Sequence, residues 1–118
     1  MKLLTDEQHA QLLANGRQQD PVRGTAGEID FRPVVKLFTP DGACTWLLTE
    51  LDPEEPDIAF GLCDLGMGTP ELGSVRLSEL AAVRGRLGLP VERDLFFEAD
   101  KGLSAYARAA LAAGRIVT

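Results

Sequence analysis

Residues 34–51 read VVKLFTPDGACTWLLTEL, and this stretch decides the fold that the sequence predicts. Its two ends, residues 34–38 and 43–51, are rich in β-branched and aromatic residues, which favour extended strands. Between them, Pro40-Asp41-Gly42 is typical of a tight turn, because proline presets the backbone and glycine tolerates a left-handed conformation. The stretch therefore predicts two antiparallel strands joined as a hairpin.

The following segments predict further strands of the same sheet. Residues 58–63 and 71–77 have strand character, and turn-forming segments precede them at 52–57 and 66–70. Connections this short join antiparallel neighbours, because a parallel pair needs a crossover of about a dozen residues or more. Residues 91–97 predict a fifth strand or an extended arm. We therefore expect an antiparallel meander sheet of four to five strands.

Two helices are predicted before and after these four strands. The first begins after Thr5, a good capping residue, and Asn15-Gly16 is its expected end, because glycine tolerates the left-handed conformation that closes helices. A short middle helix is capped by Ser78 and ends at Gly85. Together with the sheet, these helices indicate the α+β class.

A third helix is predicted near the C-terminus, where apolar residues recur at helical spacing before Gly114. Its repeating residues are Leu103, Tyr106, Ala107, Ala110 and Leu111. We expect this helix to cover one face of the sheet. Trp46 and Leu48 should then pack against it.

The chain has 118 residues, which fits one domain over residues 1–118. Residues 17–32 have no apolar periodicity and contain a proline and two glycines. Such a segment buries too little apolar surface to offset its ordering entropy. We therefore predict a mobile connector between the first helix and the sheet.

The composition excludes several classes of protein. The net charge of −6 argues against direct nucleic-acid binding, which needs a concentrated basic surface. No run of about 18 apolar residues is present, so a membrane-spanning helix is not expected. The N-terminal segment becomes acidic within six residues and lacks the apolar core of a signal peptide. A cytoplasmic location is therefore expected.

The few soft ligands do not predict a metal or cofactor site. Cys44 and Cys63 have no CxxC companion, and the single histidine, His9, is far from both in sequence. We expect His9 to be a partly buried packing residue and both thiols to be small buried hydrophobic groups. Whether the two cysteines share a sheet face depends on the strand register, which the sequence leaves open.

Carboxylates are the remaining groups with chemical potential, because the common catalytic motifs are absent from the sequence. Glu50 follows Trp46 at alternating positions, so the two should point to one side of the sheet. We predict that Glu50 and Asp52 meet the charged triplet Glu92-Arg93-Asp94 at one sheet edge, with Arg93 bridging carboxylates. The candidate binding residues are therefore Trp46, Glu50, Asp52, Glu92, Arg93 and Asp94.

Two motifs carry a resemblance to a known family. They are residues 45–52, TWLLTELD, and residues 88–95, GLPVERDL. In this combination the chain resembles an uncharacterised bacterial family, the domain-of-unknown-function family 2958, whose members are often encoded on plasmids and other mobile elements. The resemblance covers about residues 3–97, and the chain departs from the pattern in its 17–32 connector and in the alanine-rich tail after Asp100. The resemblance implies no established activity.

Three hypotheses of function follow. The first is a small non-enzymatic binding or accessory protein of bacterial mobile DNA that acts through a protein partner. The second is a small enzyme acting on nucleotides or nucleic acid, with a divalent metal held by Glu50, Asp52 and Asp94. The third is an acidic inhibitor that mimics DNA phosphates. The sequence leaves the partner, the substrate and the oligomeric state open.

Overall fold

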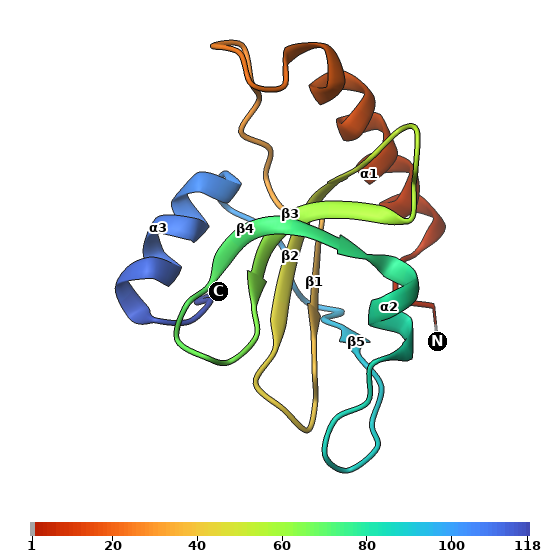
Figure 1. Ribbon diagram of the computed structural model, residues 1–118, viewed down its shortest axis with the longest axis vertical. Coiled ribbons are helices and arrows are strands. Elements are labelled where there is room, and N and C mark those ends of the chain that lie inside the picture. The colour runs from red at the N-terminus through yellow and green to blue at the C-terminus, as the bar shows by residue number, and fades with distance from the viewer. Residues whose placement is uncertain (1) are drawn as a thin grey trace.

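The computed structural model describes residues 2–118 and confirms an α+β fold built on an antiparallel sheet (Figure 1). Five strands form one sheet in the order β4-β3-β2-β1-β5. The strands are β1 (Val35–Phe38), β2 (Thr45–Leu51), β3 (Ile58–Asp64), β4 (Glu71–Arg76) and β5 (Glu92–Arg93). The helices are α1 (Asp6–Gln19), the 3-10 helix η1 (Asp20–Val22), α2 (Leu77–Ala82) and α3 (Leu103–Ala113).

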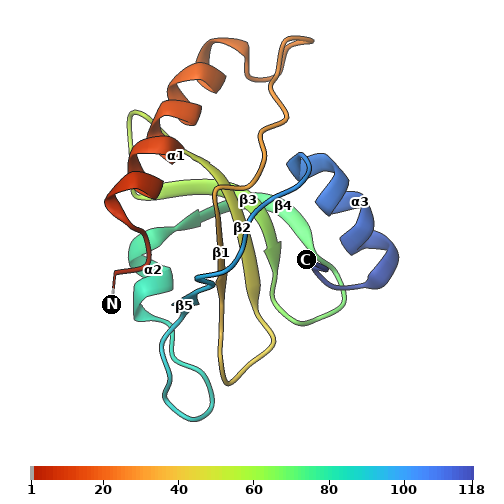
Figure 2. The same ribbon diagram turned by 180° about the vertical axis from the view of Figure 1, so that it is seen from behind.

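The first four strands form the predicted meander. Each pairs with its neighbour in sequence through a short turn. Of the predicted segment 91–97, only β5 is strand, and it pairs with β1 at the far edge of the sheet. The chain reaches that edge from β4 through α2 and the loop after it (Figures 1 and 2). The two sheet edges are therefore β4 and β5.

A β-bulge in β2 changes which side chains share a face. Leu48 pairs with Gly61, but the next cross-strand pair is Glu50 with Phe60, so one extra residue lies in β2. Because side chains alternate along a strand, this extra residue moves Glu50 to the face opposite Trp46. The prediction that Trp46 and Glu50 point to one side is therefore wrong.

The helices cover opposite faces of the sheet, and Figures 1 and 2 show α3 on one side and α1 and α2 on the other. We call these the α1 face and the α3 face. Buried apolar residues of the α1 face are Leu4, Leu12, Val35, Leu37, Trp46, Leu48, Leu51, Ala59, Leu80 and Val91. Those of the α3 face are Leu47, Leu62, Leu103, Tyr106, Ala110 and Ile116. Trp46 is buried beside Leu48 as predicted, but on the α1 face rather than against the last helix.

Helix α1 continues past its predicted end. It runs through Asn15 and Gly16 to Gln19. A side chain at Gly16 would overlap the carbonyl oxygen of Leu51, so glycine at this position permits close packing and does not end the helix. Glycine here allows the helix to lie directly on β2, and Asn15 Nδ2 donates to the carbonyl oxygen of Thr49 at 2.9 Å. The expected helix stop is therefore a packing site. His9 is exposed on α1, so its predicted partial burial is also wrong.

Helix α2 is held by a residue distant in sequence. Ser78 was predicted to cap it, but the helix begins at Leu77, and the carboxylate of Asp57 accepts hydrogen bonds from the Ser78 amide and hydroxyl. These bonds, with the nearby guanidinium of Arg76, hold the pKa of Asp57 below its ordinary value of 3.8. The helix ends at Ala82, before the expected stop at Gly85.

Helix α3 ends as predicted at Gly114, which has a φ of 74°. At its start, the Asp30 carboxylate accepts from the Ser104 amide at 3.0 Å, and the Phe31 carbonyl accepts from the Leu103 amide at 2.9 Å. The end of the 17–32 segment is thereby held to α3, and residues 17–19 belong to α1. Mobility of the rest of this segment stays a prediction.

Two further expectations concern the cysteines and the membrane. Trp46 pairs with Cys63, so Cys44 and Cys63 point to the same face of the sheet. Both are free and half-buried, and burial raises the pKa of the Cys63 thiol. Within residues 2–118 no helix has both the length and the apolar character that a membrane crossing requires.

Candidate functional site

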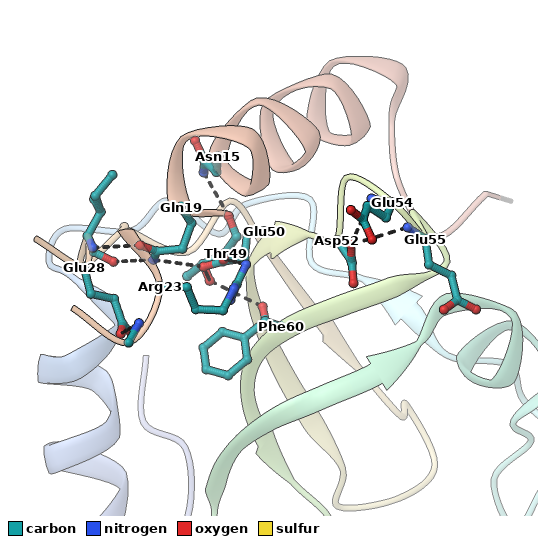
Figure 3. A network of polar contacts seen from close by, with 12 residues as sticks. Asn15, Gln19, Arg23, Glu28, Thr49, Glu50, Asp52, Glu54, Glu55 and Phe60 are labelled. Atoms are coloured by element: carbon teal, nitrogen blue, oxygen red, sulfur yellow. Dashed lines mark hydrogen bonds and ion pairs between the residues drawn. The ribbon is translucent and has the colours of Figure 1, made fainter. Parts of the chain in front are cut away.

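Glu50 is the most deeply buried of the five charged candidate residues. Its side chain is 4% exposed and lies at the bulge in β2. Arg23 Nη2 lies 3.2 Å from Oε2, while Gln19 Nε2 and Thr49 Oγ1 lie 3.4 and 3.3 Å from Oε1 (Figure 3). Arg23 and Gln19 were not among the candidates, and no sequence pattern links them to Glu50. Only the return of the chain after α1 brings them there.

Asp52 belongs to a different group from Glu50. It begins the β2–β3 turn, where its Oδ1 accepts from the Glu54 amide at 2.9 Å. Figure 3 shows Asp52 with Glu54 and Glu55, apart from the group around Glu50. Asp52 therefore stabilises a turn through a local hydrogen bond.

The charged triplet 92–94 lies in and directly after β5, at the other end of β1 from Glu50. β5 pairs with Leu37 and Phe38, whereas Val35 is the β1 residue that pairs near the bulge. The structure thus keeps the two predicted charged groups apart. Arg93 donates to the backbone oxygens of Lys2 and Leu3 at 3.0 and 3.2 Å, which places its guanidinium on the N-terminal segment.

The metal-enzyme hypothesis named a ligand set that the fold separates. Glu50 is on the α3 face, Asp52 is in a turn, and Asp94 pairs with Lys36 at 3.6 Å beside β5. Across residues 2–118, no group of three or more histidine, cysteine or carboxylate side chains is arranged to hold a metal ion. Those three carboxylates therefore do not share one site.

A cavity of about 250 Å³ lies beside Glu50 on the α3 face. The segment 29–31, the bulged part of the β2–β3 hairpin, the edge strand β4 and the start of α3 surround it. Its apolar walls are Phe31, Phe60, Leu72 and Leu103. A buried carboxylate beside an apolar cavity can bind the polar end of a small ligand.

The comparisons with known proteins give one family. A sequence model of the family described as Protein of unknown function (DUF2958) matches residues 3–117. The chain belongs to this family. The match extends past residue 97, where the resemblance was expected to end, and includes the tail after Asp100. Neither the curated proteins nor the solved structures gave a match.

The chain also exposes an apolar patch, which lies directly next to the candidate residues Glu92, Arg93 and Asp94. Phe96 is 94% exposed and Leu95 is 68% exposed, directly after β5. Phe96 and Asp94 both line two surface hollows, of about 410 and 310 Å³. We call Leu95, Phe96 and the charged residues that line these two hollows the Phe96 patch. The charged residues are Glu92, Arg93, Asp94, Glu98, Asp100 and Lys101. In the sequence, the only sign of this patch was the run Leu95-Phe96-Phe97 after a charged triplet. Such a run is equally typical of a buried strand, so the sequence alone does not show that the Leu95 and Phe96 side chains are exposed.

Proposed function

We propose that this protein is a small non-enzymatic binding protein that acts through a protein partner docked on the Phe96 patch. The observation that carries the proposal is the 94% exposure of the Phe96 side chain. An aromatic ring left in water adds little to folding stability, whereas exposed apolar patches often mark interaction sites. Aromatic residues of this kind supply much of the binding energy in protein interfaces.

The exposure of Phe96 is supported by hydrogen bonds in its own segment. The Asp94 amide donates to the Lys36 carbonyl at 2.9 Å, which fixes this segment to β1. The Phe96 amide in turn donates to Asp94 Oδ1 at 2.9 Å. Lys36 Nζ lies 3.6 Å from the same carboxylate, and both side chains are largely covered. The ring is therefore presented by an ordered turn, which lowers the entropy cost of docking.

Charge around the patch suggests the chemistry of the partner. Residues 92–101 carry four acidic and two basic side chains. One hollow beside Phe96 is lined by Glu92, Asp94 and the basic Arg93, and the other by Asp94, Glu98, Asp100 and the basic Lys101, so acidic residues outnumber basic ones in both. An apolar centre with an acidic rim suits a partner segment with basic residues around an apolar anchor.

The resemblance to a family often encoded on plasmids supports an accessory role for this binding protein in bacterial mobile DNA. The metal-enzyme alternative loses its support because its three carboxylates lie apart. The DNA-mimic alternative is also weaker, because within residues 2–118 the cations Lys2, Lys36 and Arg76 pair with surface or half-buried acids and reduce the negative charge that they present.

A crosslinking experiment followed by a binding measurement tests the proposal. A photo-reactive phenylalanine analogue at position 96 should crosslink one protein in cells, and the same analogue at Leu111 should not, although Leu111 is 77% exposed on α3. The purified partner should then bind Phe96→Ala at least about tenfold more weakly, a loss of about 1.4 kcal/mol. Leu111→Ala should bind as the wild type does.

The melting temperatures of both variants serve as the control for correct folding. They should stay close to that of the wild type, because substitutions of exposed residues usually change stability by less than about 0.5 kcal/mol. A partner that binds Phe96→Ala as tightly as wild type would overturn the proposed docking surface. Equal crosslinking from positions 96 and 111 would do the same.

A further inference from the structure

The cavity on the α3 face has a chemical character different from that of the Phe96 patch. Its charged lining residues are Glu28, Asp30 and Glu50, and no lysine or arginine of the described chain lines it. Its remaining walls are largely aromatic and aliphatic. The cavity thus combines an apolar body with negative charge, which repels anions and attracts cations.

Glu50 is buried, and its hydrogen-bond contacts are long. Hydrogen bonds to an ionised carboxylate are commonly about 2.5–2.9 Å long, with the O–H donors at the short end of that range. Within residues 2–118 its three contacts are 3.2, 3.3 and 3.4 Å, all longer than that range. Thr49 has one hydroxyl hydrogen, and its Oγ1 lies 3.3 Å from both Glu50 Oε1 and the Phe60 carbonyl oxygen. It can therefore donate fully to only one of them.

The two nitrogen donors that reach Glu50 are either shared with another acceptor or partly exposed. Gln19 Nε2 donates at 2.8 Å to the Ile29 carbonyl and lies further, at 3.4 Å, from Glu50. The Arg23 side chain is 45% exposed and approaches Oε2 with one nitrogen instead of the two-pronged arrangement typical of strong arginine–carboxylate pairs. A buried carboxylate with weak partners favours an additional positively charged donor.

We infer that this cavity binds a small organic cation, in which an amidinium, guanidinium or primary ammonium group is attached to a flat apolar body. The cationic group donates to Glu50 Oε1 from the cavity side. The apolar body packs between Phe31, Phe60 and Leu103, which line the same cavity. Arg23 is not a lining residue, so it competes with the ligand for the charge of Glu50 without occupying the ligand's space.

Three probes of nearly equal shape test the inference on the wild-type chain. Benzamidine is cationic, benzamide is neutral and benzoate is anionic at neutral pH. Benzamidine should raise the melting temperature in a concentration-dependent manner, because a ligand bound only by the folded state stabilises it. It should also shift the backbone amide resonances of Gln19, Thr49 and Phe60, whereas benzamide and benzoate should leave them unchanged.

Substitutions give the sign of the charge effect. Glu50→Gln retains the shape and should weaken benzamidine binding at least about tenfold. Arg23→Ala should strengthen binding several-fold, because it removes the competing cation. The matched control is Glu54→Gln, which removes an exposed carboxylate from the β2–β3 turn and should leave binding unchanged.

Several results would overturn the inference. Equal binding of benzamide would show a merely apolar cavity, and binding of benzoate would show an anion site. Weaker benzamidine binding by Arg23→Ala would mean that Arg23 helps to hold the ligand. Absence of any amide shift up to about 10 mM benzamidine would show that no such site exists. If Glu50→Gln fails to fold, the wild-type probe series and Arg23→Ala still decide. None of these results bears on the Phe96 patch.

Discussion

The two faces of the sheet differ in how completely they are packed with apolar groups. Ten buried apolar residues form the cluster on the α1 face, and six form the cluster on the α3 face. Within residues 2–118 the two buried carboxylates, Glu50 and Asp64, both lie on the α3 face. Glu50 pairs across the strands with Phe60, and Asp64 follows Leu62 on the same face of β3. The α1 face is thus a conventional core, whereas the α3 face contains buried charge and a cavity.

Asp64 shows how the α3 face closes around its buried charge. Its two carboxylate oxygens accept from the Gly66 amide at 2.8 Å and from the Ile116 amide at 2.9 Å. Asp64 is therefore satisfied by the backbone, and it attaches the C-terminal segment to the end of β3. Glu50 has longer contacts and borders a cavity. The comparison separates a structural buried carboxylate from one that is available to a ligand.

The largest effect is expected on the α1 face, from Trp46→Ala. The Trp46 side chain is 3% exposed among leucines, so its removal should lower the free energy of unfolding by about 3–5 kcal/mol. Chemical denaturation of both proteins measures this difference. In the folded wild type, emission from the single tryptophan should be blue-shifted from that of indole in water, and an indole-like spectrum would show that the α1 face is not closed.

A smaller effect is expected where α1 contacts the sheet. Gly16→Ala should destabilise by about 1–3 kcal/mol, because the new methyl group overlaps the Leu51 carbonyl and must push α1 away from β2. The matched control is Gly73→Ala on the edge strand β4, where the added methyl group meets open space. Similar melting temperatures for the two variants would contradict the close contact of α1.

The smallest effect concerns pH on the α3 face. Burial raises the pKa of Tyr106 above its ordinary value of 10.0, and the Asp100 carboxylate that accepts its hydroxyl hydrogen raises it further, against an opposing effect of the Asp100 amide. Above that value the unfolded chain loses the phenol proton first, so the stability due to neutral Tyr106 is present below pH 10 and falls as the pH rises.

Melting temperatures from about pH 9 to about pH 11 measure this dependence. Tyr106→Phe should lose a few degrees at neutral pH and then show a shallower alkaline decline than the wild type. An equally steep decline in both proteins would assign the alkaline loss to other groups, and the α3 face would then not be the pH-sensitive one.

Local sequence patterns were sufficient for most of the secondary structure. The hairpin of β1 and β2 was predicted from strand-forming residues around Pro40-Asp41-Gly42, and α3 from apolar spacing ended by Gly114. The helix start at Thr5 is confirmed by reciprocal 3.0 Å hydrogen bonds with Gln8. These features depend on residues close together in the chain, so the sequence contains their whole cause.

The errors occur where a distant residue outweighs a local signal. Asn15-Gly16 has the composition of a helix end, but α1 continues because Gly16 lies against Leu51. Ser78 has the composition of a cap, but Asp57 of another turn accepts its hydrogen bonds. In both cases the contact with a residue distant in sequence stabilises the structure more than the locally predicted helix end or cap would.

The candidate sites divide in the same way. The sequence by itself determined the strands, the acidic charge and the presence of Leu95 and Phe96 beside a charged triplet. Only the tertiary structure decided that Phe96 faces water and that Glu50 faces a cavity. Glu50 faces the cavity because of a single β-bulge in β2. One extra residue reverses the alternation of side chains between the two faces, and no local residue preference predicts where it occurs.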